Sequence, residues 1–147
     1  MSQDVVSFQS AGLRLHGVLS VPDGVRPGER RAAFLVLHGF GSNSDSPNCI
    51  TPAGILNGYG YVTLRFDMRG CGKSEGEFGR VICLEQVEDT GNALEFLAKH
   101  PSVDPNRIGV SSALEHERPQ PRAMEMGDPG FEPGTSSLSE KRSNRLS

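Results

Sequence analysis

Two stretches of this chain decide its fold: AAFLVLHGFGS at residues 32–42 and YVTLRFDMRGCGKSEG at residues 61–76. Residues 32–37 are apolar at every position, which is typical of a strand in a parallel sheet that helices cover on both faces. Residues 61–66 read as the next buried strand. Both runs continue into glycine-rich segments, which indicate tight loops because glycine adopts backbone angles closed to other residues. Each stretch therefore predicts a buried strand that ends in a loop.

The residues before these stretches predict a β-hairpin. Residues 5–9 and 13–21 are two β-type runs, and Ser10-Ala11-Gly12 between them is a turn signal. Apolar and polar residues alternate along 13–20, which predicts a half-exposed antiparallel pair.

Two helices and a last strand complete the pattern. Pro47 suits the first turn of one helix. After the second stretch, apolar residues recur at spacings of three and four, which predicts an amphipathic helix. Its inner face is predicted to hold Leu84, Val87, Gly91, Leu94 and Ala98, and its outer face Glu85, Glu88, Glu95 and Lys99. A further strand begins at residues 107–110. A hairpin followed by β-α-β-α-β predicts an open, mainly parallel α/β sheet.

Composition and charge narrow the class of protein. The net charge of −3 argues against nucleic acid or an anionic membrane as the main partner. Cys49, Cys71 and Cys83 show neither metal-ligand spacing nor a CxxC pair, so they favour reduced thiols in a cytoplasmic protein and predict no metal site. No basic segment followed by an apolar run opens the chain, and no stretch has the length of a membrane span. We therefore expect neither a signal peptide nor a membrane helix.

The composition of the chain changes after Val110. From Leu114 to Ser147 only seven of 34 residues are apolar, whereas eleven are charged and four are proline. Such a segment cannot bury enough apolar surface to offset its ordering entropy. We therefore expect a globular domain over residues 1–112 and a disordered tail over residues 113–147. The abrupt change also suggests a gene-model or splicing product. A transcript with a longer frame and Gly-x-Ser-x-Gly after Val110 would support this hypothesis, and a transcript that ends as written would count against it.

Three motifs in order give the chain a specific resemblance. LVLHGFGS at residues 35–42 places a His-Gly turn after a buried strand, FDMRGCGKSEG at 66–76 follows the next strand, and DPNRIGV lies at 104–110. In this order they resemble the first half of an α/β-hydrolase, closest to the serine esterase, acyl-peptidase and S33-type aminopeptidase branches. The resemblance covers about residues 5–110, roughly half of a complete domain of about 250 residues. It implies hydrolysis of an ester, amide or peptide bond in a small-molecule or peptide substrate by a Ser-His-Asp mechanism, without a metal or organic cofactor.

This resemblance gives the two loops different roles. Acyl transfer builds negative charge on the substrate carbonyl oxygen, and the family stabilises it with an N–H of the first loop and one from the residue after the nucleophile. Here the first donor is expected to be Phe40, with Gly41 as its neighbour. The other motif residues are expected to be structural: His38, Gly39, Asp67, Arg69, Gly70, Gly72, Ser74 and Gly76. Without the resemblance, His-Gly could simply end a strand at a turn.

The segment Gly70–Ser74 leaves a different function open, nucleotide binding. Gly-Cys-Gly-Lys-Ser after a buried strand resembles a phosphate-binding loop. However, the motif G-x-x-x-x-G-K-[ST] would need its first glycine at Asp67. A carboxylate at that position would repel phosphate.

The sequence does not supply a convincing catalytic triad. The family's nucleophile lies in G-x-S-x-G on a sharp turn, and residues 109–113 meet only a degenerate form of it, with Ser111 about two residues early. The downstream candidates for base and acid are His116, Glu115, Glu117 and Asp128. No later strand follows to position them, and neither His16 nor His100 is expected to belong to a catalytic group.

We therefore expect little or no hydrolase activity from the 147 residues alone, as for a domain truncated before its nucleophile turn. The alternative is a non-catalytic short isoform or binding module. It would associate with a partner such as the full-length hydrolase, or with itself through the unpaired edge of its sheet.

Overall fold

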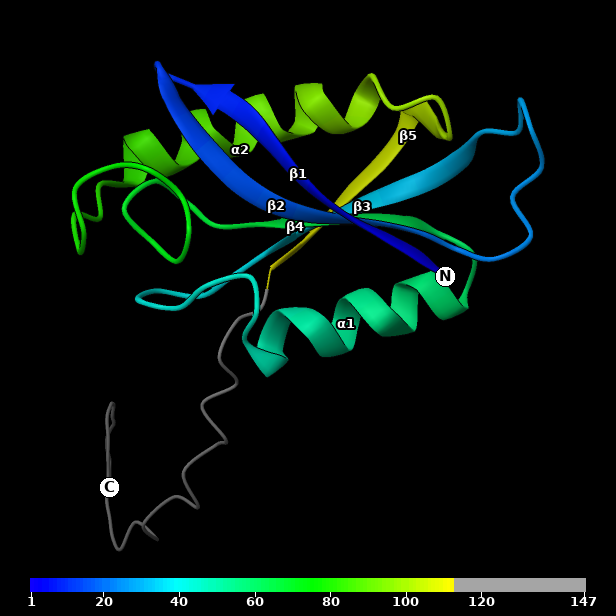
Figure 1. Ribbon diagram of the computed structural model, residues 1–147, viewed down its shortest axis with the longest axis horizontal. Helices are drawn as coiled ribbons and strands as arrows, with labels where there is room; N and C mark the ends of the chain where they lie inside the picture. Colours follow the sequence, from blue (N-terminus) through cyan, green and yellow to red (C-terminus); the bar gives the residue numbers. More distant parts are fainter. Residues whose placement is uncertain (113–147) are drawn as a thin grey trace, which may run out of the picture. The chain divides into compact units, whose positions relative to one another are not determined.

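A computed structural model describes residues 1–112 as a five-stranded mixed sheet with one helix on each face (Figure 1). The elements are β1 (Ser2–Ser10), β2 (Leu13–Val21), β3 (Arg31–Leu37), α1 (Pro47–Gly58), β4 (Val62–Phe66), α2 (Cys83–Ala98) and β5 (Val103–Ser112). The predicted disordered tail, residues 113–147, lies outside the described residues, as do the candidate residues Glu115, His116, Glu117 and Asp128.

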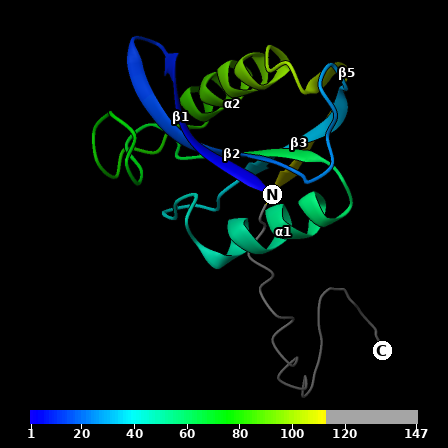
Figure 2. The same cartoon turned by 45° about the vertical axis from the view of Figure 1, so that its right-hand side comes forward.

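The strand order is β1-β2-β4-β3-β5. Strand β2 pairs antiparallel with β1 and β4, whereas β3 lies parallel to both β4 and β5. The two β-α-β connections cross the sheet in opposite directions. Since such connections are right-handed, they place α1 and α2 on opposite faces, as Figure 2 shows. The predicted hairpin followed by β-α-β-α-β is confirmed.

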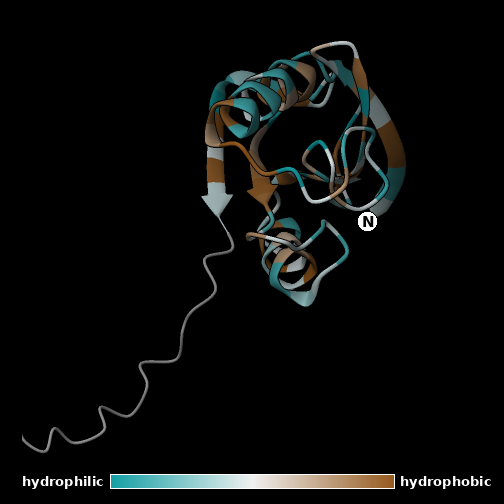
Figure 3. Cartoon of the chain, turned by 90° about the vertical axis from the view of Figure 1, so that its left-hand side faces the viewer, coloured by the Kyte–Doolittle hydropathy of each residue, from teal (hydrophilic) through white to brown (hydrophobic). Residues whose placement is uncertain are grey.

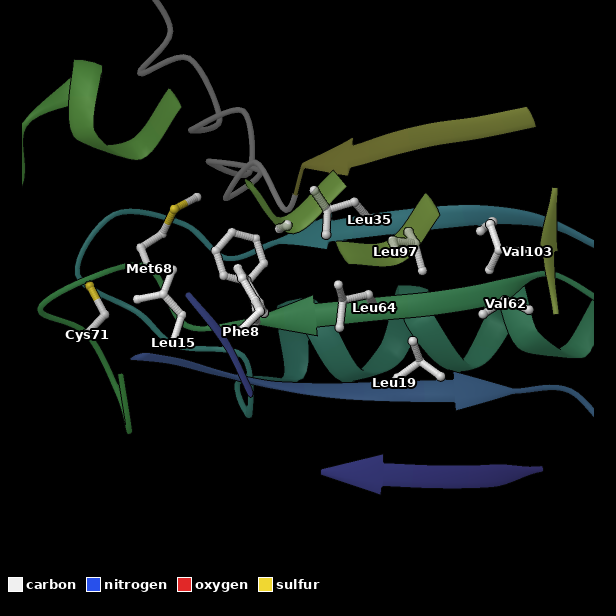
Figure 4. Packing of buried hydrophobic residues seen from close by; sticks show 13 residues of the cluster. Phe8, Leu15, Leu19, Leu35, Val62, Leu64, Met68, Cys71, Leu97 and Val103 are labelled. Carbon is white, nitrogen blue, oxygen red and sulfur yellow. The ribbon is translucent and has the colours of Figure 1, made fainter. Parts of the chain in front are cut away.

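The larger core lies between α2 and the sheet. Leu19, Leu64 and Leu35 lie in register across β2, β4 and β3 and form a row of buried side chains (Figure 4). Leu97 of α2 and Phe8 of β1 belong to the same cluster. Complete burial of one such leucine stabilises the fold by about 1.5–3 kcal/mol. This cluster therefore holds the hairpin, the parallel strands and α2 together.

A smaller core lies between α1 and the sheet, formed by Val36, Cys49 and Ala53. In Figure 3 the hydrophobic stretches of the strands lie between the two helices. The prediction that β2 is half-exposed is wrong for residues 17–20, which are all buried. The cause is a helix on each face: Leu19 lies in the α2 core, while Asn57 of α1 donates a hydrogen bond to the Ser20 carbonyl.

The predicted inner face of α2 is wrong for Leu84, Val87 and Gly91, whereas Leu94 does pack against the core. Leu84 is 81% exposed and Val87 is 67% exposed, whereas Asp89, Ala93 and Leu97 are buried. The spacing rule counted apolar residues only. The Asp89 carboxylate binds Arg69 and Ser10, so Asp89 rather than Leu84 or Val87 points inward.

Candidate functional site

The loops after β3 and β4 lie side by side at the edge of the sheet where these parallel strands end (Figures 1 and 2). The β3–α1 loop comprises residues 38–46, and the β4–α2 loop comprises residues 67–82. Asp67 joins them, because its carboxylate accepts the Ser44 N–H at 2.7 Å and the Lys73 N–H at 3.0 Å. One buried side chain therefore orders both loops.

The carboxylate of Asp67 is held in its ionised form. Burial alone would raise its pKa, but the N–H donors of Lys73 and Ser44 outweigh burial, and the pKa lies below its ordinary value. Gly72 permits this close approach: a Cβ there would lie 2.4 Å from the Cγ of Asp67, and the φ angle is +49°. The carboxylate oxygens are thus engaged by the loops.

A second carboxylate, Asp89 of α2, anchors the β4–α2 loop. Asp89 is fully buried, its Oδ1 lies 2.8 Å from Nη2 of Arg69, and its Oδ2 accepts the Arg69 N–H at 2.9 Å. Ser10 donates its hydroxyl to the same carboxylate at 2.7 Å. Such charge-assisted hydrogen bonds are about twice as strong as neutral ones. The network ties the loop, α2 and the hairpin into one unit.

Further hydrogen bonds hold the β4–α2 loop together and join it to β2. The Ser74 hydroxyl donates to the Asp67 carbonyl at 2.6 Å and accepts the His16 N–H at 2.8 Å. At Gly70 a Cβ would lie 2.4 Å from the Glu77 carbonyl oxygen, so only glycine fits this crossing of the loop. At Gly76 a Cβ would lie 2.7 Å from the Gly70 nitrogen. The residues predicted to be structural in this loop are therefore brought together.

His38 bridges the two loops through its ring. Its Nε2 accepts the Met68 N–H at 3.0 Å, so the ring proton lies on Nδ1, which is 2.8 Å from the Gly39 carbonyl oxygen. The residue is 7% exposed. With both nitrogens engaged by backbone groups, the ring has no free position to accept a proton from a nucleophile.

The candidate oxyanion donors lie at the tip of the β3–α1 loop. Within residues 1–112, neither the Phe40 N–H nor the Gly41 N–H donates a hydrogen bond, whereas the next one, that of Ser42, donates to the Gly39 carbonyl at 3.1 Å. Gly41 adopts a φ of +68°. Both residues are exposed, so these two adjacent N–H groups are open to water or to an acceptor on a ligand.

A cavity of about 530 Å³ opens beside these donors. Both loops line it, through Phe40, Gly41, Ser42, Asn43, Gly70, Cys71, Gly72, Phe78, Gly79 and Val81. Burial raises the pKa of the Cys71 thiol, as do the nearby carboxylates of Asp67 and Asp89, so the thiol is neutral. The cavity therefore combines free backbone donors with an uncharged lining.

Ser111 lies within a strand. It pairs with Val36 in the β3–β5 ladder, and β5 continues through Ser112. In the described part of the chain, no serine hydroxyl donates to a histidine ring. The structure therefore does not bring Ser111, His16 and His100 together as a triad.

One contact was missed by the sequence analysis. Nδ1 of His16 lies 3.4 Å from Oδ2 of Asp67, because β2 pairs antiparallel with β4 and Gly17 faces Phe66. His100 is elsewhere, where its Nδ1 accepts the Ser102 N–H at 3.1 Å. No local pattern carries the β2–β4 register, so the sequence offered no signal for the histidine–carboxylate pair.

The segment Gly70–Ser74 is not arranged as a phosphate cradle. The N–H groups of Gly70, Cys71 and Ser74 donate to carbonyl oxygens of the same loop, and the Lys73 N–H donates to Asp67. Four of the five N–H groups of this segment are thus occupied, and that of Gly72 has no acceptor among the described residues. Residues 1–112 contain no cluster of three or more metal-ligating side chains. No helix in that range is long and apolar enough to cross a membrane.

No family model matches the chain, but curated proteins are similar to it in sequence. It is 35% identical over 111 residues to the polyketide transferase ATR5 of Stachybotrys chlorohalonatus, covering 74% of this chain and 35% of that protein. It is 32% identical over 102 residues to the thiohydrolase aneE of Aspergillus aculeatus, covering 67% of this chain and 30% of that protein.

Solved structures match the described fold. The hypothetical protein PA2218 of Pseudomonas aeruginosa superposes with a TM-score of 0.68 at 30% identity, covering 74% of this chain and 34% of that one. The α/β-hydrolase GrgF of Penicillium sp. sh18 gives a TM-score of 0.68 at 24% identity, covering 76% of this chain and 37% of that one. The chain spans 27% to 35% of the lengths of the curated relatives it matches. In motifs, topology and relatives the chain resembles the α/β-hydrolases, and its described residues form the amino-terminal part of that fold.

Proposed function

We propose that this chain belongs to a serine hydrolase of ester, amide or peptide bonds, of the esterase, acyl-peptidase or S33 aminopeptidase type. Its part is to stabilise the oxyanion that forms on the substrate carbonyl. The observation that carries the proposal is the pair of free N–H groups at Phe40 and Gly41, beside a cavity and on a loop held by Asp67. Relatives named a thiohydrolase and a polyketide transferase support chemistry at an acyl group.

The physical reason lies in the charge of the transition state. Attack on a carbonyl moves negative charge onto its oxygen, and donors fixed beforehand stabilise that charge without having to reorganise. Removal of one such donor in a complete enzyme lowers kcat by roughly 10²–10³-fold. The β4–α2 loop supports this task, because Asp67 accepts the Ser44 N–H and so fixes the β3–α1 loop.

A matched pair of variants tests the proposed donor. Phe40→Pro removes both the N–H and the phenyl ring, whereas Phe40→Ala removes the ring alone. In an NMR titration with methylphosphonate, which presents an anionic tetrahedral oxygen, we expect the Phe40 and Gly41 N–H signals to shift in the natural chain. We expect binding to be kept in Phe40→Ala and lost in Phe40→Pro. Equal binding by the two variants would contradict the proposal.

The nucleophile, base and acid belong to the same proposal but not to the described residues. We propose that the 147 residues alone have little or no hydrolase activity, since Ser111 lies in β5 rather than on a turn. Fluorophosphonate labelling of the purified chain tests this, and we expect no labelled serine. Labelling that disappears in Ser111→Ala would identify Ser111 as an activated nucleophile and overturn the proposal.

A non-catalytic role is the second candidate, and the edge of the sheet favours it. Within the described residues β5 pairs with β3 on one side only, and Val110 is 50% exposed. An open edge is a template for another chain, a second copy or the full-length hydrolase, rather than for nucleic acid or a membrane. Sedimentation velocity over a range of concentrations would reveal such self-association.

The proposed location is the cytoplasm, supported by the free thiols of Cys49, Cys71 and Cys83.

A further inference from the structure

The cavity between the two loops has a lining unlike the rest of the loop surface. None of its ten lining residues has an acidic or basic side chain, although Asp45, Lys73 and Glu77 lie close by in the same loops. The neutral thiol of Cys71 belongs to the lining. A cavity of about 530 Å³ is large enough for a small organic group.

Two aromatic side chains, one from each loop, are left uncovered at this cavity. Phe40 is 85% exposed and Phe78 is 92% exposed, and both line the cavity. Four of the ten lining residues are glycines. At Gly41 and Gly79 a Cβ would meet no atom within 4 Å, so the missing side chains leave open space beside the two rings. A ligand group that covers the phenyl rings would remove apolar surface from water.

The cavity shares Phe40 and Gly41 with the proposed oxyanion site. A carbonyl oxygen at these N–H groups would lie at the cavity that Phe78 and Val81 also line. We propose that this cavity binds an uncharged apolar substituent of the substrate, aromatic or branched, and that Phe78 and Val81 determine its size. The inference rests on the proposed function for the position of the carbonyl, but the apolar contact exists without catalysis.

Neutral amides test the cavity on the purified 147-residue chain, because they offer a carbonyl oxygen without a reactive bond. Acetamide and phenylacetamide differ by one phenyl group. In two-dimensional NMR titrations we expect phenylacetamide to bind about tenfold or more tightly than acetamide, as the burial of a phenyl group would give. The signals of Cys71, Gly79 and Val81 should shift on binding.

Three variants sharpen the test. Phe78→Ala removes one wall and Val81→Trp fills the cavity, so each should weaken phenylacetamide about fivefold or more while leaving acetamide unchanged. Tyr59→Ala is the matched control, because Tyr59 is an aromatic residue that is 77% exposed after the end of α1, outside both loops. It should bind phenylacetamide as the natural chain does. Unchanged signals from α1 and β4 would establish that each variant is folded.

The outcomes separate this inference from the proposed function. Equal affinity for both amides, or signal shifts confined to Cys83, Val87 and Leu94 on α2, would overturn the cavity assignment. If Phe78→Ala weakens phenylacetamide while Phe40→Pro and Phe40→Ala bind it equally, the cavity assignment stands and the oxyanion role fails. If Phe40→Pro binds more weakly than Phe40→Ala while the phenyl group makes no difference, the oxyanion role stands and the cavity assignment fails.

Discussion

The β3–α1 loop and the β4–α2 loop are both rich in glycine and both follow parallel strands, yet their hydrogen bonding differs. In the β4–α2 loop, N–H groups including those of Gly70, Lys73 and Ser74 are engaged within the loop. In the β3–α1 loop, the N–H groups of Phe40 and Gly41 have no acceptor among the described residues. Both loops contain engaged and free backbone donors, since the N–H groups of Gly72 and Phe78 also have no acceptor among the described residues. Glycine content therefore does not separate a scaffold from a binding loop; what distinguishes the β4–α2 loop is the set of donors that bind back to the loop itself.

The largest effect is expected from the anchor of the β4–α2 loop. Asp89→Ala leaves the mostly buried Arg69 without its main partner, and breaking a buried ion pair costs about 3 kcal/mol or more. Urea denaturation followed by circular dichroism measures the free energy of unfolding. Glu88→Ala is the control, because Glu88 also pairs with Arg69 but its side chain is 52% exposed. Its removal should cost about 0.5 kcal/mol or less, and equal losses in the two variants would contradict the scaffold role.

The next effect concerns two glycines with opposite expectations. Gly72→Ala forces a Cβ against the Asp67 carboxylate at a positive φ, which should lower the free energy of unfolding by about 2 kcal/mol. Gly91→Ala lies in α2, where a Cβ meets nothing within 4 Å. It should stabilise the protein by about 0.5–1 kcal/mol. The same denaturation experiment compares both, and a neutral Gly72→Ala would show that Asp67 can withdraw from the loop without loss.

The pH dependence of the free energy of unfolding tests the hydrogen bonds by which the Asp67 carboxylate links the two loops. The pKa of Asp67 is lowered on folding from its ordinary value of 3.8, so its contribution is complete above about pH 4 and is lost as the pH falls through the folded value. The free energy of unfolding should therefore decrease from pH 5 towards pH 2.5. Asp67→Asn should make this decrease shallower, while Glu77→Gln, at a 75% exposed side chain, should leave it unchanged. An identical slope in Asp67→Asn would show that the Asp67 carboxylate does not contribute to the pH dependence of stability.

The smallest effect is expected where the β4–α2 loop enters α2. Leu84 is 81% exposed, so Leu84→Ala should change the free energy of unfolding by about 0.5 kcal/mol or less. The helix spacing read from the sequence would instead place Leu84 in the core, where the same substitution costs about 2–5 kcal/mol. The denaturation midpoint of this one variant thus decides which face of α2 is buried.

Much of the fold could be predicted, because strands and loops leave local signals. The apolar run at residues 32–37 and the turn at residues 10–12 correspond to β3 and to the hairpin of β1 and β2. Two features could not be predicted, because they depend on tertiary partners. The inward position of Asp89 requires Arg69 and Ser10, and the pairing of His16 with Asp67 requires the β2–β4 register.

The candidate site was predictable only in part. The motif indicated Phe40 and Gly41 as donors, and the structure leaves their N–H groups free beside a cavity. The cavity itself could not be predicted, because Phe78 and Val81 are distant in sequence from Phe40 and reach it through the path of the β4–α2 loop.

Amide hydrogen exchange measured by NMR tests the contrast between the two loops most directly. We predict that the Phe40 and Gly41 N–H groups exchange at nearly the rate of an unfolded chain, while those of Gly70, Lys73 and Ser74 are clearly protected. Equal protection of both groups of donors would mean that the Phe40 and Gly41 N–H groups already have an acceptor, and would contradict the assignment of the β3–α1 loop as the site that binds the carbonyl oxygen.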